Sequence, residues 1–151
     1  SRYFNAHDMY FIGRNVDYAA SLEASLKLKE ISYIHSEAYT AGELKHGPIS
    51  LLEDGTLVIA IATYEKLFDK MMSNVREVKA RGAVVLGITV RGKEEALKQE
   101  TDYQFCVPDI TDFMLPSLSI LPLQLFAYYV ASMKGCDIDK PRNLAKSVTV
   151  E

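Results

Sequence analysis

Residues 56–89 read TLVIAIATYEKLFDKMMSNVREVKARGAVVLGIT, and they indicate the fold class of the chain. Residues 56–62 and 83–89 are continuous apolar runs, which is typical of buried strands. Between them, residues 66–81 carry apolar side chains at helical spacing, and Gly82 follows as a natural C-terminal cap. Continuous apolar strands joined by a helix predict a parallel sheet that is covered on both faces.

The same alternation extends outward in both directions. Further strands are expected at residues 9–12 and 103–107, and further helices at residues 16–34, 94–99 and 116–134. Residues 34–48 are expected to form a loop, with one helical turn around 42–44. We therefore predict an α/β fold, a doubly wound three-layer α/β/α sandwich with a mainly parallel sheet. Ligands of such sheets bind at the carboxyl ends of the strands, near a switch point in strand order.

Two apolar patterns carry predictions about burial. In the helix at residues 16–34, the apolar positions at helical spacing are expected to face the core, and they are Leu22, Leu26, Ile31 and Ile34. The long apolar stretch at residues 114–133 contains Pro116, Pro122 and several polar side chains. A buried core helix is therefore expected there in preference to a membrane span.

The composition limits the partners of the chain. Its 151 residues carry a net charge of −3, with 48% hydrophobic and 25% charged residues. This balance is typical of one globular domain, and it argues against nucleic acid as the main partner. The sequence contains no run of basic residues that would suggest binding to a membrane surface. Cys106 and Cys136 have neither disulfide-scaffold nor metal-ligand spacing, so we expect a cytoplasmic protein.

Glu23, Lys27 and Glu30 lie at positions i, i+4 and i+7 and therefore share one helix face. Such spacing alone is typical of an exposed ion pair. The alternative is a Lys–Glu pair arranged for proton transfer. Spacing leaves both interpretations open.

Two other segments contain candidates for catalysis. His46 precedes a Gly-Pro pair in a segment rich in His and Glu, which suits an acid–base role, whereas no spacing there predicts a metal site. Lys146, near the C-terminus, could form a Schiff base with a carbonyl substrate, and Arg142 precedes it by four positions. A surface lysine is the simpler interpretation. The loops after the predicted strands show no convincing phosphate cradle.

Three motifs carry a family resemblance: KLKEISYIH at residues 27–35 with EAY at 37–39, GELKHGP at 42–48, and DKPRNLAKSVTVE at 139–151. Together they resemble the isomerase part of the glucosamine-6-phosphate synthase family. That family has a glutaminase domain followed by two sugar isomerase (SIS) subdomains, and this chain resembles the second. The resemblance implies an SIS subdomain at residues 1–136 and a catalytic tail at 137–151. Because the chain begins with Ser1, we expect that it was processed or cut from something longer, with the glutaminase and first SIS subdomain lying outside it.

The resemblance also implies roles for individual residues. Lys146 matches the lysine that forms a Schiff base with open-chain fructose 6-phosphate, and Glu30 matches the base that moves a proton between C1 and C2. Lys27 matches a lysine that assists this step. His46 matches the histidine of ring opening, which reaches the active site of the neighbouring subunit. The supporting positions are Arg142, Glu23 and Ala145.

The implied activity is that of an aminotransferase which makes glucosamine 6-phosphate from fructose 6-phosphate and glutamine, as a homodimer without a metal or cofactor. The isolated chain is expected to be weakly active or inactive, because the phosphate-binding loops and the ammonia source lie in the other domains. One alternative is a non-catalytic SIS module that binds a sugar phosphate for regulation. Another is a related sugar-amine isomerase or deglycase.

Overall fold

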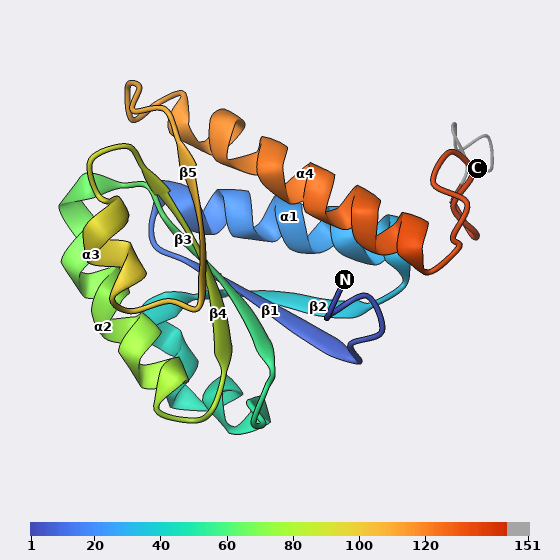
Figure 1. Cartoon of the computed structure of the whole chain (residues 1–151), viewed down its shortest axis with the longest axis horizontal. Helices are drawn as coiled ribbons and strands as arrows, with labels where there is room; N and C mark the ends of the chain where they lie inside the picture. The colour runs from blue at the N-terminus through green and yellow to red at the C-terminus, as the bar shows by residue number, and fades with distance from the viewer. Residues whose placement is uncertain (145–151) are drawn as a thin grey trace, which may run out of the picture.

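The computed structural model describes residues 1–144 and shows a five-stranded, all-parallel sheet between two helical layers (Figure 1). The strand order is β2-β1-β3-β4-β5. The strands are β1 (Asp8–Gly13), β2 (His35–Thr40), β3 (Leu57–Ala62), β4 (Val84–Val90) and β5 (Tyr103–Val107). The predicted α/β class and doubly wound architecture are confirmed.

Each face of the sheet has its own helical layer and its own core. One layer consists of α1 (Val16–Ser32) and α4 (Leu115–Met133). The other contains α2 (Phe68–Lys79), α3 (Glu94–Lys98), and the short 3-10 helices η1 (Ala41–His46) and η2 (Pro48–Leu51), with η3 (Glu65–Leu67) leading into α2. Along β3, Ile59 faces the first layer and Val58 the second. Both faces are buried, which explains the continuous apolar runs in the central strands.

Strand β2 is a departure from the sequence prediction, which made residues 34–48 a loop. Its sequence, HSEAYT, contains no apolar run because β2 is an edge strand that pairs with β1 alone. Ser36 is its fully buried position, and the Ser36 hydroxyl donates a 2.9 Å hydrogen bond to the carbonyl oxygen of Ser25 in α1. A hydrogen bond from a serine therefore holds this edge strand against α1. The sequence prediction looked for an apolar run and so missed the strand.

The buried face of α1 also differs from the prediction. Leu22 and Leu26 are 48% and 44% exposed, whereas small residues on the other side of the helix face the core. The buried residues of α1 are Asp17, Ala20, Ser21, Ala24, Ser25, Leu28 and Ser32. The buried hydroxyls of Ser21 and Ser32 donate to backbone carbonyls one turn earlier, so their polarity is satisfied within the helix. Apolar periodicity therefore selected the wrong face, although Ile34 is buried as predicted.

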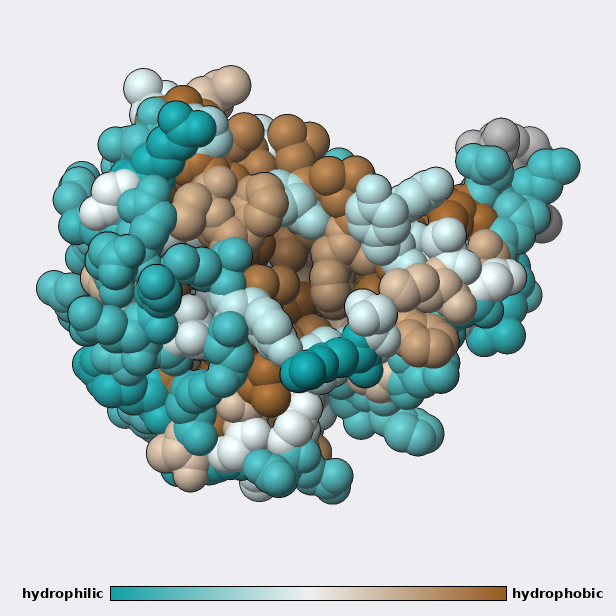
Figure 2. Space-filling model, in the orientation of Figure 1, coloured by the Kyte–Doolittle hydropathy of each residue, from teal (hydrophilic) through white to brown (hydrophobic). Residues whose placement is uncertain are grey.

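Helix α4 is only partly buried, whereas a buried core helix was predicted. Leu123, Ala127 and Val130 pack into the core, while Leu125 and Tyr129 point outward at 56% and 61% exposure. The apolar surface along this helix is visible in Figure 2. Within residues 1–144, α4 alone is long and apolar enough to cross a membrane, by length and composition only. Its inner face is part of the core, which accounts for part of its apolar character.

Candidate functional site

The carboxyl half of α1 brings together the charged side chains that helical spacing placed on one face. The Lys27 ammonium lies 2.7 Å from a Glu30 carboxylate oxygen and 3.7 Å from one of Glu23. The hydrogen bond with Glu30 is the main reason that the pKa of Lys27 lies above its ordinary value, and partial burial opposes it. Lys27 is therefore a cation at neutral pH, so it supplies positive charge beside the Glu30 carboxylate and is not itself a base.

A pocket of about 480 Å³ opens at this end of α1, and both Glu30 and Arg142 line it. Its lining residues are Leu26, Lys29, Glu30, Tyr33, Ile34, His35, Arg142, Asn143 and Leu144. The pocket therefore lies between the last turn of the helix and the segment that leads toward the C-terminus. Its walls combine an acid, three basic side chains and apolar surface, a mixture suited to a small polar ligand.

Tyr33 joins this segment to the helix, and sequence reasoning did not single it out. The backbone N–H of Arg142 donates a 2.8 Å hydrogen bond to the Tyr33 hydroxyl oxygen, and the guanidinium lies 4.1 Å from the ring centroid. Tyr33 caps α1 in the left-handed conformation, with φ of 61°. The sequence prediction continued the helix through Ile34, because nothing in the local pattern signals a positive φ at a tyrosine.

The remaining predicted residues are not brought to this pocket by the described chain. His46 lies at the end of η1, on the α2 side of the sheet, where its side chain is 62% exposed and 4.0 Å from Glu43. Glu30 belongs to the layer on the other side. Lys146 and Ala145 lie outside the described residues, so their roles stay predictions.

The amino end of α1 contains a second, different carboxylate. Asp17 is 2% exposed and accepts hydrogen bonds from the Thr63 N–H at 2.9 Å, the Tyr64 N–H at 3.0 Å and the Thr63 hydroxyl. Burial raises the pKa of Asp17 to about 6, and the three hydrogen bonds limit that rise. Sequence reasoning gave no hint of this contact, because it joins a helix to a loop 46 positions away.

Asp17 lies at the switch point of the sheet, where the chain has built β2 on one side of β1 and then continues with β3 on the other. Ligands were expected at this edge. A smaller pocket of about 160 Å³ does lie at the ends of β3 and β4, and its charged lining residues are Arg91, Lys93, Glu65, Asp109 and Asp112. Lys93 already pairs with Glu65 at 3.3 Å, and the carboxylates outnumber the cations, which disfavours a phosphate there. The candidate acid–base residues lie instead at the opposite end of α1.

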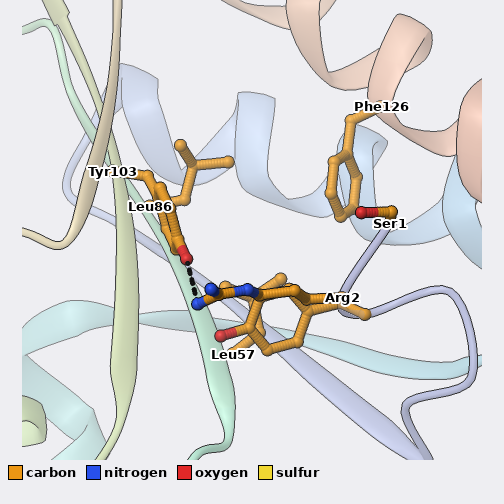
Figure 3. Close-up of a pocket in the computed structure, with 7 residues that line it drawn as sticks. Ser1, Arg2, Leu57, Leu86, Tyr103 and Phe126 are labelled. Carbon is orange, nitrogen blue, oxygen red and sulfur yellow. Dashed lines mark hydrogen bonds between the residues drawn. The ribbon is translucent and has the colours of Figure 1, made fainter.

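A third pocket, of about 480 Å³, lies between α4 and the sheet (Figure 3). Leu57, Leu86 and Phe126 make it apolar, and Arg2 donates a 3.1 Å hydrogen bond to the Tyr103 hydroxyl at its rim. It holds no carboxylate. Within residues 1–144, no group of three His, Cys, Asp or Glu side chains is placed to hold a metal ion. The pocket at the carboxyl end of α1 is therefore the best candidate for catalysis.

Comparison with known proteins agrees with the fold and the motifs. The SIS domain profile matches residues 2–134. Glutamine–fructose-6-phosphate aminotransferase [isomerizing] of Clostridium tetani is 59% identical over 144 residues, covering 95% of this chain and 24% of that protein. The enzyme of the same name from Caldanaerobacter subterraneus subsp. tengcongensis is 57% identical over 151 residues, covering 100% of this chain and 25% of that protein. The chain thus spans about a quarter of the length of these relatives.

Solved structures show the same similarity. The C-terminal domain of glucosamine-fructose-6-phosphate aminotransferase from Francisella tularensis superposes with a TM-score of 0.87 at 38% identity, covering 91% of this chain and 39% of that one. A glucosamine-6-phosphate deaminase from Thermotoga maritima gives a TM-score of 0.74 at 30% identity, covering 94% of this chain and 40% of that one. These matches confirm the resemblance that the sequence motifs indicated.

Proposed function

The chain belongs to the SIS domain family, and from this premise we propose that it is the C-terminal isomerase part of a glutamine–fructose-6-phosphate aminotransferase. The observation that carries the proposal is the meeting of Glu30 and Arg142 in one pocket, with Lys27 at 2.7 Å from Glu30. Lys146 follows Arg142 by four positions in the sequence.

The proposed reaction begins at Lys146. Its neutral amine attacks C2 of open-chain fructose 6-phosphate and water leaves, which gives a Schiff base that can accept an electron pair. Ammonia from glutamine then displaces the lysine, so that C2 carries an imine. Glu30 takes one proton from C1 and a proton is returned to C2, while the C1 hydroxyl loses its proton and the imine nitrogen gains one. This leaves an amine at C2 and an aldehyde at C1: glucosamine 6-phosphate.

In this scheme Lys27 holds the Glu30 carboxylate in place and offsets its charge. Arg142 contributes a cation to the pocket wall, where it orients the open-chain sugar. Both roles need positive charge at neutral pH, which the raised pKa of Lys27 secures for that residue. Glu23 supports Lys27 from one turn earlier, at 3.7 Å.

The proposal includes partner domains. Apolar side chains on the outer faces of α1 and α4 support packing against another domain, and those exposed by more than two fifths are Leu22, Leu26, Leu121, Leu125, Tyr128, Tyr129 and Met133. We assign that role to the first SIS subdomain, which would hold the sugar phosphate, while a glutaminase domain supplies ammonia. The whole enzyme would work in the cytoplasm, where the two free cysteines stay reduced.

We further propose a homodimer in which His46 serves the site of the neighbouring subunit. The position of η1, across the sheet from Glu30, supports this arrangement. In the full-length enzyme, His46→Ala and Lys146→Ala variants are each expected to be inactive, and mixing them should restore part of the activity. Failure of the mixture to recover any activity would indicate a site built within one chain.

Borohydride trapping tests the central step. The full-length enzyme is treated with fructose 6-phosphate and borohydride, and the sugar adduct is located by peptide mass spectrometry. The adduct is expected on Lys146 and should vanish in Lys146→Arg, whereas the matched tail variant Lys140→Arg should retain it. Sugar binding without any adduct would contradict the proposal and favour the regulatory SIS module.

A further inference from the structure

Tyr33 adopts a conformation that its own side chain disfavours. A φ of 61° is uncommon for any residue other than glycine and is unusual for a bulky aromatic one. Such a conformation persists where surrounding contacts determine it, and it is concentrated at functional sites. Within residues 1–144, Tyr33 belongs to neither core cluster, so core packing does not account for it.

The contacts of Tyr33 are with the segment that leads to the tail. Its hydroxyl oxygen accepts the Arg142 N–H at 2.8 Å, and its ring face holds the Arg142 guanidinium at 4.1 Å. The positive φ turns the chain at the end of α1, so that the ring forms a wall of the pocket that contains Glu30. The strained residue thus fixes both the backbone and the side chain of Arg142.

We infer that Tyr33 is a positioning residue that latches residues 141–144 to the end of α1 and thereby fixes Arg142 in the pocket that it shares with Glu30. This inference rests on the proposed function. Tyr33 need not touch the sugar. Its contribution comes from two separate contacts, a backbone hydrogen bond and a cation–π contact, and two substitutions separate them.

Tyr33→Phe keeps the ring and removes the hydrogen-bond acceptor. Tyr33→Asn removes both contacts but keeps a residue that tolerates positive φ, so the cap of α1 is preserved. Tyr18→Phe, near the other end of the same helix, is the matched control. Each variant is made in the full-length enzyme, and the initial rate of borohydride-trapped adduct on Lys146 is measured at fructose 6-phosphate well below KM.

We expect the adduct rate to fall about five-fold in Tyr33→Phe and about 20-fold in Tyr33→Asn. These ratios correspond to the usual free-energy contributions of one hydrogen bond, and of one hydrogen bond together with one cation–π contact. Hydrogen exchange in peptides spanning residues 137–144 should speed up in the same order. The melting temperature of Tyr33→Asn should stay close to that of the wild type, because relief of the backbone strain offsets the two lost contacts. Tyr18→Phe should match the wild type throughout.

The outcomes distinguish this inference from the proposed function. If the wild type forms the adduct and Tyr33→Asn forms it at the same rate, the latch is wrong while the Schiff-base enzyme stands. The latch is equally wrong if the adduct rate falls only in proportion to lost folded protein, with exchange at residues 137–144 unchanged. If the wild type forms no adduct on Lys146, the proposed function fails and the inference fails with it.

Discussion

The two ends of α1 carry carboxylates in different surroundings, one buried and one lining a pocket. At the amino end, Asp17 is 2% exposed and accepts three hydrogen bonds. At the carboxyl end, the Glu30 side chain is 27% exposed, contacts Lys27 and lines a pocket. The first carboxylate is enclosed by protein donors, and the second retains access to a ligand. One helix therefore has a structural end and, under the proposed function, a chemical end.

This difference between the two ends of α1 limits the general rule that ligands of parallel sheets bind at the carboxyl ends of the strands, near the switch point. A helix that begins at the switch point is a ready anion site, because its N-terminus carries partial positive charge. Here the protein supplies the anion itself, since Asp17 lies in the first turn of α1 and reaches the loop after β3. The switch point then serves to join helix and sheet, and the proposed chemistry lies at the far end of the helix.

The largest expected effect concerns the chemical end. Glu30→Gln in the full-length enzyme keeps the shape of the side chain but removes the base, so turnover should fall by about 10²- to 10⁴-fold. Trapping of the sugar on Lys146 should survive, because Schiff-base formation precedes the proton transfer. Steady-state kinetics and trapping are compared in the same preparation, with Glu23→Gln as the control. Near-normal turnover of Glu30→Gln would remove Glu30 from the site.

At the structural end, the expected effect depends on pH. The folded state raises the pKa of Asp17 from 3.8 to about 6, so its contribution to stability is complete below about pH 3.8 and is lost as the pH rises through about 6. Relative to Asp17→Asn, the wild-type chain should lose about 3 kcal/mol of unfolding free energy across that range. Urea unfolding of both chains at several pH values measures this difference. A difference that is independent of pH would show that Asp17 titrates normally.

Removing the Asp17 carboxylate altogether should have a smaller effect on stability at neutral pH. Asp17→Ala leaves the backbone N–H groups of Thr63 and Tyr64 without their acceptor, which should cost about 1–3 kcal/mol of unfolding free energy. Asp69 is an exposed residue in the first turn of α2, so Asp69→Ala is the control and should change little. In the full-length enzyme, sugar trapping on Lys146 should persist in Asp17→Ala. Loss of trapping in a folded variant would place Asp17 in the chemistry.

The smallest expected effect is at Glu23, one turn before Lys27 in α1. Glu23 lies 3.7 Å from Lys27 and is about half exposed, so water screens the pair. Glu23→Ala should change the unfolding free energy by no more than about 0.5 kcal/mol. A loss of several kcal/mol on urea unfolding would mean that Glu23 belongs to a tighter network than the contact indicates.

The sequence predicted those elements whose burial leaves a local pattern of apolar residues. Strands β3 and β4 were recognisable because burial on both faces demands continuous apolar runs. Strand β2 was missed because an edge strand with a serine contact leaves no such run. The buried face of α1 was misjudged because small residues, not leucines, pack against the sheet.

The contacts at the candidate site also fall into those that local spacing predicts and those that only the fold creates. The pairing of Lys27 with Glu30 follows from helical spacing and was foreseen. The Asp17 and Tyr33 contacts were not, because each joins segments far apart in the chain, and the positive φ of Tyr33 depends on its tertiary surroundings. Family motifs placed Arg142 at the site, but its contact with Tyr33 required the fold.

Hydrogen exchange of the full-length enzyme with and without fructose 6-phosphate tests most directly whether the two ends of α1 differ in function. We expect ligand-dependent protection in peptides spanning residues 26–36 and 137–144, and no change in peptides spanning residues 14–20 and 62–66. Protection confined to residues 14–20 and 62–66 would place the sugar at the switch point and contradict the account.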